Sequence, residues 1–410
     1  MQKTVLMNYA KLLARAGLNV QKGQEVIISA ELDQPEFVSL IAEECYRAGA
    51  AKVRVEWTHQ PLDKISAEYR SEEVLGEVLP WQEEKLREET KRLPARLYLE
   101  SRDPDGMSGI DEEKYSRARQ ARLKITKPYR DEMENKYQWC IAAVAGRNWA
   151  KKVFPKANAA AAEEKLWEAI LKCSRAYEGN PLANWQAHNE ELAARCAYLN
   201  NLGLVSLEYK SSNGTDLKVG LMEQGLFMGG GETTLAGVYF NPNIPSEECF
   251  TTPMRGQAEG IVYSTKPLSY QGKLIRNFSI RFEGGRAVEA HAASGEAALK
   301  KMIAMDEGAA YLGECALVPY DSPISRSKTL FYNTLFDENA SCHFALGRGF
   351  TNCVRGYENY SDEQLKAMGV NDSMIHVDFM IGTDDLNITG VTKSGERVPI
   401  FREGNWAFKA

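Results

Sequence analysis

Short apolar runs alternate with amphipathic stretches through the first half of the chain. Residues 26–29 form a β-branched run, the stretch from Asp33 to Gly49 has helical periodicity, and residues 52–57 alternate between apolar and polar side chains. A strand, a helix and a second strand in this order predict a βαβ unit, which is the building block of a parallel sheet. We expect Asp33 to cap the helix, because its carboxylate can accept hydrogen bonds from the free amides of the first turn.

The same alternation continues, less clearly, to about residue 180. It predicts two further strands and two further helices, at 96–99 (strand), 111–134 (helix), 139–144 (strand) and 159–174 (helix). The sequence contains neither GxGxxG nor GxxxxGK[ST], the glycine-rich motifs that hold nucleotide phosphates in α/β domains. This half of the chain therefore lacks the fingerprint of a nucleotide-binding domain.

The second half of the chain has a different pattern. Pairs of strand-like segments flank turn residues such as Asn213-Gly214 and Gly284-Gly285, which predicts antiparallel hairpins. The paired segments are 206–209 with 216–219 and 274–282 with 286–290. We therefore expect an α/β domain with parallel βαβ units over residues 1–190 and an α+β domain over residues 191–410.

Composition and charge exclude several classes of protein. Hydrophobic residues make up 44% of the 410 residues and charged residues 26%, which is ordinary for a folded, soluble protein. The net charge is -6, with 50 basic residues dispersed among 56 acidic ones, which argues against a nucleic-acid partner. We expect no membrane segment, because no apolar run approaches the ~20 residues that a spanning helix needs. The first twenty residues carry charges and lack a small-residue cleavage site, so we expect no signal peptide and a cytoplasmic protein.

The eight cysteines are scattered along the chain without a CxxC pair. In a chain without a signal peptide, this spacing is typical of reduced, structural cysteines. A cysteine hydrolase that uses Cys249 or Cys342 with a distant histidine would need an activated thiolate, which no motif indicates. Cys342 and His343 do not form a nucleophile–base pair, because neighbouring side chains on a helix point about 100° apart.

Two segments of the second half place carboxylates beside apolar runs. In residues 243–253, Glu247 and Glu248 precede a β-prone run, and in residues 311–319, Glu314 interrupts an apolar strand. A lone buried glutamate is strongly destabilising unless it is paired or bound to a cation. The alternative interpretations are a helix cap with two solvated glutamates in the first segment and an edge-strand glutamate that faces water in the second.

Two further segments carry histidines. In residues 339–347 we expect His343 to lie on an amphipathic helix, where a histidine is more often a core residue than a ligand. In residues 373–382, His376 and Asp378 are two positions apart in a strand pattern, so their side chains share one face while apolar neighbours pack behind them. An exposed polar face on an edge strand is the alternative interpretation.

Together these segments supply three carboxylates and two imidazoles, a donor set without thiolates. Such donors suit Zn²⁺, Co²⁺, Mn²⁺ or Mg²⁺. Three carboxylates in one pocket repel one another unless cations lie between them, and two divalent ions would bring +4 against -3, or -4 with Glu247. The candidate ligands are Glu248, Glu314, His343, His376 and Asp378. Their separation along the chain leaves open whether they meet in space.

The strings NIPSEECFTTP, LGECALVP and SMIHVDFMIG, with the segment around His343 before the third, resemble in this order the motifs of the thermophilic-type metallo-aminopeptidases. The resemblance extends over the whole chain. It implies an α/β N-terminal domain, a metal-binding C-terminal domain and a cocatalytic dinuclear site that removes N-terminal residues from peptides. It also implies a homodimer whose active sites face an inner cavity.

The resemblance also implies roles for single residues. The five candidate ligands match the family's metal ligands, with Glu314 in the position that bridges the two ions. The family has a catalytic tyrosine seven residues after the histidine that corresponds to His343, where this chain has Phe350. This chain therefore lacks the hydroxyl group at that position.

Two clustered cations would allow hydrolysis of a peptide bond. They would lower the pKa of a bridging water and polarise the scissile carbonyl, while the free α-amine of the peptide binds one of them. A carboxylate must then carry the proton to the leaving amine, and we assign this role of general base to Glu247; a hydrogen-bond partner of the ligands is its alternative role. The alternative to an enzyme is a non-catalytic protein of the same fold that binds peptides or metal, and Phe350 is the feature in its favour.

Overall fold

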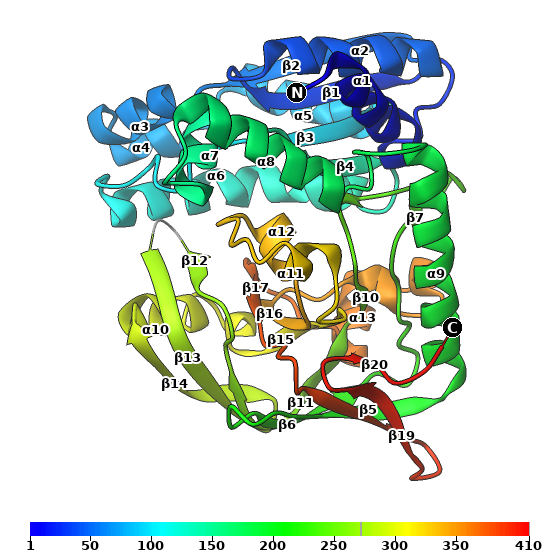
Figure 1. Ribbon diagram of the computed structural model, residues 1–410. Helices are drawn as coiled ribbons and strands as arrows, with labels where there is room; N and C mark the ends of the chain where they lie inside the picture. Colours follow the sequence, from blue (N-terminus) through cyan, green and yellow to red (C-terminus); the bar gives the residue numbers. More distant parts are fainter. Residues whose placement is uncertain (271–272, 410) are drawn as a thin grey trace. The chain divides into compact units, whose positions relative to one another are not determined.

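The computed structural model describes residues 1–270 and 273–409, and the chain divides into two compact units (Figure 1). The first unit consists of residues 1–186 and 231–245, and the second of residues 187–230 and the chain from 246 onward. Helix α9 (Pro181–Asn201) begins in the first unit and ends in the second, so residue 190, the expected domain boundary, lies within a helix. Across the described ranges, we find no helix with the length and apolar character that a membrane span requires.

A parallel five-stranded sheet with the order β2-β1-β3-β4-β9 forms the centre of the first unit. Its strands are β1 (Glu25–Glu31), β2 (Lys52–Thr58), β3 (Ala95–Glu100), β4 (Trp139–Ala143) and β9 (Asn243–Ile244). The order of the first four strands is that of a doubly wound fold, which confirms the prediction of an α/β domain. Strand β9 comes from the returning segment 231–245, which also forms the small hairpin of β7 (Glu232–Thr233) and β8 (Tyr239–Phe240).

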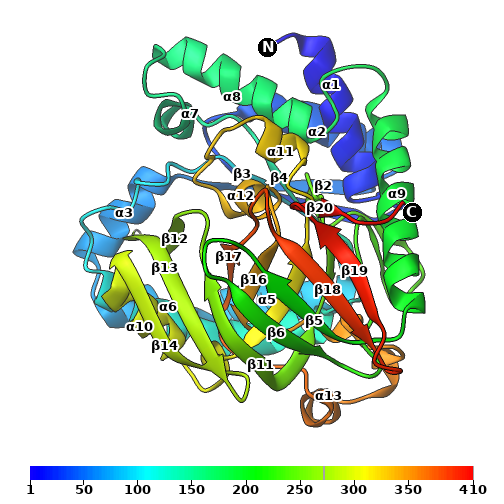
Figure 2. The same ribbon diagram turned by 60° about the horizontal axis from the view of Figure 1, so that its bottom comes forward.

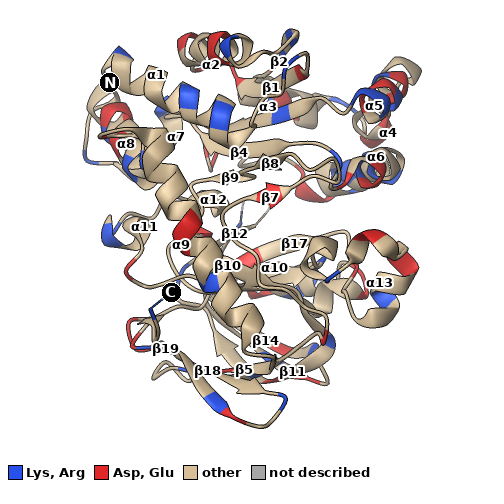
Figure 3. Ribbon diagram, turned by 90° about the vertical axis from the view of Figure 1, so that its right-hand side faces the viewer, with Lys and Arg blue, Asp and Glu red and all other residues tan. Residues whose placement is uncertain are grey.

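Helices surround this sheet, and several pack through aromatic rings. They are α1 (Lys3–Leu12), the π-helix η1 (Leu13–Gly17), α2 (Pro35–Ala48), α3 (Gln60–Tyr69), α4 (Glu72–Gly76), α5 (Pro80–Arg92), α6 (Glu112–Met133), α7 (Arg147–Val153) and α8 (Ala159–Cys173). The rings of Tyr9 and Phe37 stack at 5.5 Å, and Phe37 meets Trp167 edge-on at 5.2 Å, so α1, α2 and α8 share one apolar contact. Basic and acidic side chains are interspersed along α5 and α6 (Figure 3).

The expected cap of helix α2 is wrong by one residue. Gln34 is the residue before the helix, because Pro35 occupies its first position and fixes where the helix begins. Asp33 instead accepts a hydrogen bond from the Ser101 hydroxyl at 2.9 Å.

The second unit contains a large antiparallel sheet with the order β12-β13-β11-β6-β5-β18-β19-β20, and β14 pairs with β13 (Figure 2). Its strands are β5 (Leu204–Lys210), β6 (Asp216–Leu221), β11 (Pro253–Tyr263), β12 (Leu268–Tyr270), β13 (Lys273–Glu283), β14 (Arg286–Ser294), β18 (Asn387–Thr392), β19 (Arg397–Arg402) and β20 (Asn405–Trp406). Both expected hairpins are present, as β5–β6 and β13–β14. The prediction of a second, α+β domain is therefore confirmed.

A second antiparallel sheet of this unit has four short strands in the order β10-β15-β16-β17. They are β10 (Cys249–Thr251), β15 (Leu312–Leu317), β16 (His343–Gly347) and β17 (His376–Met380). The expected helix around His343 is wrong, because this residue begins strand β16. A short apolar run such as Phe344–Leu346 fits a buried strand as well as a buried helix, and here pairing with two neighbouring strands decides for the strand.

Short helices complete the second unit. They are α10 (Glu296–Ile303), η2 (Gly308–Ala310), α11 (Pro323–Arg326), α12 (Thr334–Glu338), η3 (Thr351–Cys353), η4 (Tyr357–Asn359) and α13 (Asp362–Met368). The last residue of α12 lies five positions before His343, so the loop after this helix leads directly into strand β16.

Candidate metal centre

One face of the four-stranded sheet collects the candidate ligands. Glu314, Ala345 and Asp378 are partners across β15, β16 and β17 and therefore lie in one row. His343 and His376 lie two positions from Ala345 and Asp378, so strand alternation puts both imidazoles on the same face as this row. The small side chain of Ala345 leaves room between the two carboxylates.

Two glycines allow the ends of these strands to approach closely. Gly347 has a φ of +107°, and a Cβ atom there would lie 2.0 Å from the carbonyl oxygen of Ile375. A Cβ atom on Gly313 would lie 2.3 Å from the carbonyl oxygen of Arg348. Any larger residue at either position would push the strands apart.

The ligand atoms form two overlapping groups. Glu248, Glu314 and His343 make one group and Glu314, His376 and Asp378 the other, with the atoms of each group within 4.8 Å of one another. The shortest approaches are 3.2 Å between Glu248 Oε2 and His343 Nε2 and 3.0 Å between Glu314 Oε2 and His376 Nε2. Glu314 belongs to both groups. The structure therefore brings together all five side chains that the sequence nominated.

Both imidazoles are oriented by backbone carbonyl groups. The Nδ1 atom of His376 lies 2.7 Å from the carbonyl oxygen of Arg348, and that of His343 lies 3.2 Å from the carbonyl oxygen of Ser341. A proton on Nδ1 of each ring donates to the carbonyl and leaves the Nε2 lone pair for a ligand. Both Nε2 atoms point into the carboxylate cluster.

Burial and mutual repulsion perturb the titration of this cluster. Burial raises the pKa of Glu314 to about 7, against the opposing effect of its hydrogen bond to His376. Burial favours neutral His343, but its hydrogen bond to Glu248 and the surrounding carboxylates outweigh this effect and raise its pKa to about 9. Burial also opposes ionisation of Asp378, yet the charge of His376 lowers the pKa of this carboxyl to about 2. The three carboxylates of the candidate ligands therefore outnumber the two imidazoles that can offset their charge.

Glu338 also belongs to this cluster, although the sequence analysis did not nominate it. Burial, followed by the charges of Asp378, Glu248 and Glu314, holds the pKa of Glu338 well above its usual value. Its position in the fold explains why it was missed. Glu338 is the last residue of the five-residue helix α12, which the sequence analysis did not predict.

Glu247 is buried beside the cluster and has a different set of neighbours. Its backbone N–H donates to Asn339 Oδ1 at 2.7 Å, and its Oε2 atom lies 3.8 Å from Nε2 of His188. The same Nε2 atom of His188 lies 2.7 Å from the carbonyl oxygen of Ser246. Asn339 and His188 together fix the chain segment that leads to Glu248.

Phe350, at the position of the family's catalytic tyrosine, lies next to the cluster. Its ring centroid is 4.9 Å from that of His376 and 5.2 Å from that of Phe250. The backbone N–H of Phe350 donates to Thr252 Oγ1 at 2.7 Å, which fixes the start of this loop. Phenylalanine keeps an aromatic ring beside His376 but offers no hydroxyl group.

The donor set suits divalent cations. Carboxylate oxygens and imidazole nitrogens without thiolates are typical of Zn²⁺, Mn²⁺, Co²⁺ and Mg²⁺ sites. The Oδ1 atom of Asp378 is buried and lies 3.3 Å from Nε2 of His376, without a hydrogen bond to any residue that the structure describes. A cation would bind this oxygen and would relieve the repulsion among the carboxylates, so the residues fit a metal centre.

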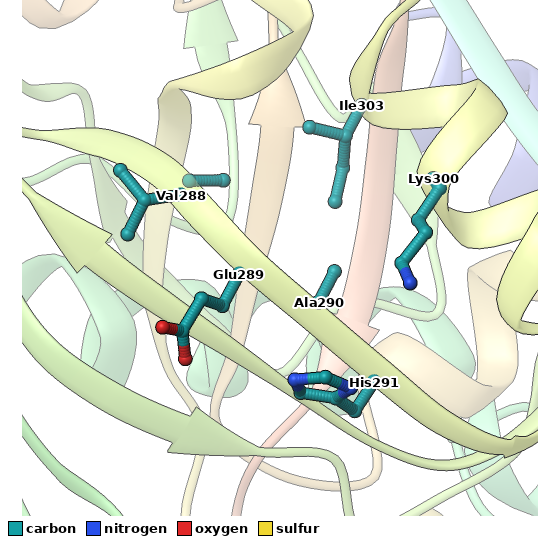
Figure 4. A pocket seen from close by; sticks show the side chains of 7 residues that line it. Val288, Glu289, Ala290, His291, Lys300 and Ile303 are labelled. Atoms are coloured by element: carbon teal, nitrogen blue, oxygen red, sulfur yellow. The ribbon is translucent and has the colours of Figure 1, made fainter.

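A cavity elsewhere in the second unit is a weaker candidate for the functional site. It measures about 320 Å³ and lies along β14 and α10, where Glu289, His291 and Lys300 line it together with apolar side chains (Figure 4). His291 is exposed, and Lys300 pairs with Glu296 of its own helix. None of the residues that line this cavity belongs to the metal cluster, so the four-stranded sheet remains the candidate functional site.

Comparison with known proteins identifies the family of the chain. The model of the thermophilic metalloprotease family (M29) matches residues 2–406. Aminopeptidase AmpS of Bacillus subtilis is 42% identical over 404 residues, 98% of each chain, and Aminopeptidase 2 of Geobacillus stearothermophilus is 40% identical over 405 residues, again 98% of each chain. The chain is also similar to the solved structure of wild-type AmpT from Thermus thermophilus, with a TM-score of 0.91 and 38% identity. The alignment covers 99% of this chain and 100% of the AmpT chain. The chain therefore belongs to the thermophilic metalloprotease family M29.

Proposed function

We propose that the protein is a metal-dependent aminopeptidase that removes N-terminal residues from peptides by means of two divalent cations. The observation that carries this proposal is the pair of overlapping donor groups that share Glu314. The names of the relatives, all aminopeptidases at 38–42% identity, support the same reaction.

In this proposal Glu314, which belongs to both donor groups, would help to hold both cations. Glu248 and His343 complete the first site, and His376 and Asp378 complete the second. Glu338 is an additional oxygen donor, because it shares its surroundings with the carboxylates of both sites. The donor set admits Zn²⁺, Co²⁺, Mn²⁺ or Mg²⁺.

The chain's own residues would orient the reactants and move the proton. When bound, the cations polarise the scissile carbonyl, lower the pKa of the attacking water and attract the α-amine of the peptide. The carbonyl groups of Ser341 and Arg348 hold the imidazoles in one tautomer, so that the ligand atoms are pre-oriented. Glu247 would take the proton of the water and pass it to the leaving amine, from a backbone position that Asn339 fixes.

Hydrolysis of aminoacyl-p-nitroanilides tests this function. We expect hydrolysis by protein loaded with Co²⁺, Zn²⁺ or Mn²⁺ and none by protein that has been exhaustively chelated. N-terminally acetylated substrates are the control, since an aminopeptidase requires the free amine. A metal-loaded protein that binds these substrates without hydrolysing them would favour the non-catalytic alternative.

The proposed substrates are peptides with a free N-terminus. The homodimer and the cytoplasmic location expected from the sequence stay predictions, which sedimentation and cell fractionation test.

A further inference from the structure

Access to the metal cluster differs from ligand to ligand. The His376 side chain is 27% exposed, whereas the other four candidate ligands are each 10% exposed or less. A substrate that reaches the cluster therefore approaches it on the side of His376.

An apolar group of side chains lies on that side, and we call it the Phe350 cluster. Its members are Phe350, Phe250, Met228, Ala316 and Cys353. The ring of Phe350 stands beside the imidazole of His376 with 4.9 Å between centroids, and Phe250 meets Phe350 edge-on at 5.2 Å. Ala316 and Cys353 are fully buried beneath, while Phe350 and Met228 keep part of their surface exposed.

The strand register explains why this cluster adjoins the ligands. Phe250 on β10 is the partner of Ala316 on β15, and Ala316 is the partner of His343 on β16. Phe250 therefore extends the row of side chains that contains His343, on the same face of the sheet. The apolar side chains of the cluster and the candidate ligands therefore lie next to one another on the same face of the sheet.

The cluster is held in place by backbone hydrogen bonds. Met228 and Phe250 exchange two N–H···O bonds of 2.8 Å each. Phe350 is tied to Thr252 through both its N–H and its carbonyl group, at 2.7 Å and 3.1 Å. Because the bonds of Met228 use only its main chain, the side chain of Met228 can be changed without removing them.

We propose that the Phe350 cluster receives the side chain of the substrate's N-terminal residue and selects apolar residues such as leucine, methionine and phenylalanine. This inference rests on the proposed aminopeptidase function. A peptide whose α-amine lies at the metal centre must place its first side chain beside the centre, and on the accessible side that surface is apolar. Each methylene group buried there improves binding about fourfold, whereas a charged side chain would lose its hydration without gaining a partner.

A panel of p-nitroanilides of leucine, phenylalanine, alanine, lysine and glutamate tests the inference. We expect the metal-loaded wild type to hydrolyse the leucine and phenylalanine substrates with at least ~10-fold higher kcat/KM than the lysine and glutamate substrates. Met228→Ala should lower kcat/KM for leucine and phenylalanine about 10-fold relative to alanine, mainly through KM. Met228→Leu, which nearly conserves the volume of the side chain, should keep the preference of the wild type for leucine and phenylalanine.

Met254→Ala is the matched control. Met254 is also a partly buried methionine, but it packs against a different cluster, that of Met222, Val354, Leu365 and Val370. Its substitution should leave the ratio of leucine to alanine hydrolysis unchanged.

The possible failures are distinguishable. If the metal-loaded wild type hydrolyses none of the substrates, the proposed function fails and this inference fails with it. If it hydrolyses lysine and glutamate substrates as well as leucine, or if Met228→Ala and Met254→Ala change the leucine-to-alanine ratio equally, the aminopeptidase function stands and the Phe350 cluster is not its selective surface.

Discussion

The two faces of the four-stranded sheet are built from neighbouring residues and have opposite chemistry. On one face lie Glu314, His343 and Asp378, and on the other lie the residues that follow them in sequence, Cys315, Phe344 and Phe379. The second set is fully buried in the main apolar core of the unit. Because strand side chains alternate, every ligand is anchored by a core residue next to it.

The comparison shows how a fold can hold several buried carboxylates. Burial on the site face disfavours the charge of Glu314 and raises the pKa of this carboxyl. The core face stabilises the same strands by burying large aromatic rings, including Phe344 and Phe379, which lie 6.1 Å apart. We expect changes on the two faces to separate activity from stability.

The largest expected effect is that of metal removal, which acts on the site face alone. Exhaustive chelation should abolish hydrolysis of leucyl-p-nitroanilide, and Co²⁺, Zn²⁺ or Mn²⁺ should restore it, because the proposed reaction depends on the bound cations. Circular dichroism serves as the control for folding. Full activity after chelation would contradict the assignment of a metalloenzyme.

The next largest effect is expected from the shared ligand. Glu314→Gln should remove more bound metal than Glu247→Gln, because Glu314 belongs to both donor groups and Glu247 to neither. Both variants should lose most activity, since the second loses its proton carrier. Our division of roles is wrong if Glu247→Gln loses as much metal as Glu314→Gln.

Two neighbouring residues of β16 give the sharpest contrast between the faces. His343→Ala should lose activity and metal affinity while remaining folded, because it removes a ligand but no apolar side chain of the core. Phe344→Ala should destabilise the protein by about 3–5 kcal/mol, because it deletes a fully buried ring from the core. Thermal unfolding and metal titration of both variants check this, and equal loss of stability in the two would contradict the contrast.

Local pattern predicted much of this architecture, and its larger failures have one cause. The unit of strand, helix and strand over residues 26–57 and the shared face of His376 and Asp378 depend on neighbours in sequence, and both are present in the structure. The strand at His343 depends on pairing with β15 and β17, and the return of residues 231–245 to the parallel sheet depends on β4. Periodicity along one segment carries no information on such distant partners.

The candidate site, like the fold, was predicted in part from the sequence. Residue types in four segments nominated the five side chains that the structure brings together, and motif resemblance matched them to metal ligands, whereas spacing alone left their convergence open. Glu338 was missed because a single glutamate at the end of a short helix resembles an ordinary surface residue. Only the folded chain shows that it lies among the other carboxylates.

The smallest expected effect concerns the ring beside His376. Phe350→Tyr adds a hydroxyl that can donate a hydrogen bond to the developing oxyanion, an interaction typically worth ~10²–10³ in kcat. We expect kcat to rise by no more than this factor with little change in KM, because metal polarisation already supplies part of the stabilisation. Steady-state kinetics at constant metal content measure it, and an unchanged or lower kcat would show that another donor already serves or that the hydroxyl is misplaced.

The number of divalent cations bound per chain tests the central claim most directly, because the account rests on two sites that share Glu314. Elemental analysis of protein saturated with Zn²⁺ or Co²⁺ and freed of excess metal should give two ions per wild-type chain. A wild-type protein that is fully active with one ion per chain, or that retains no stoichiometric metal, would contradict it.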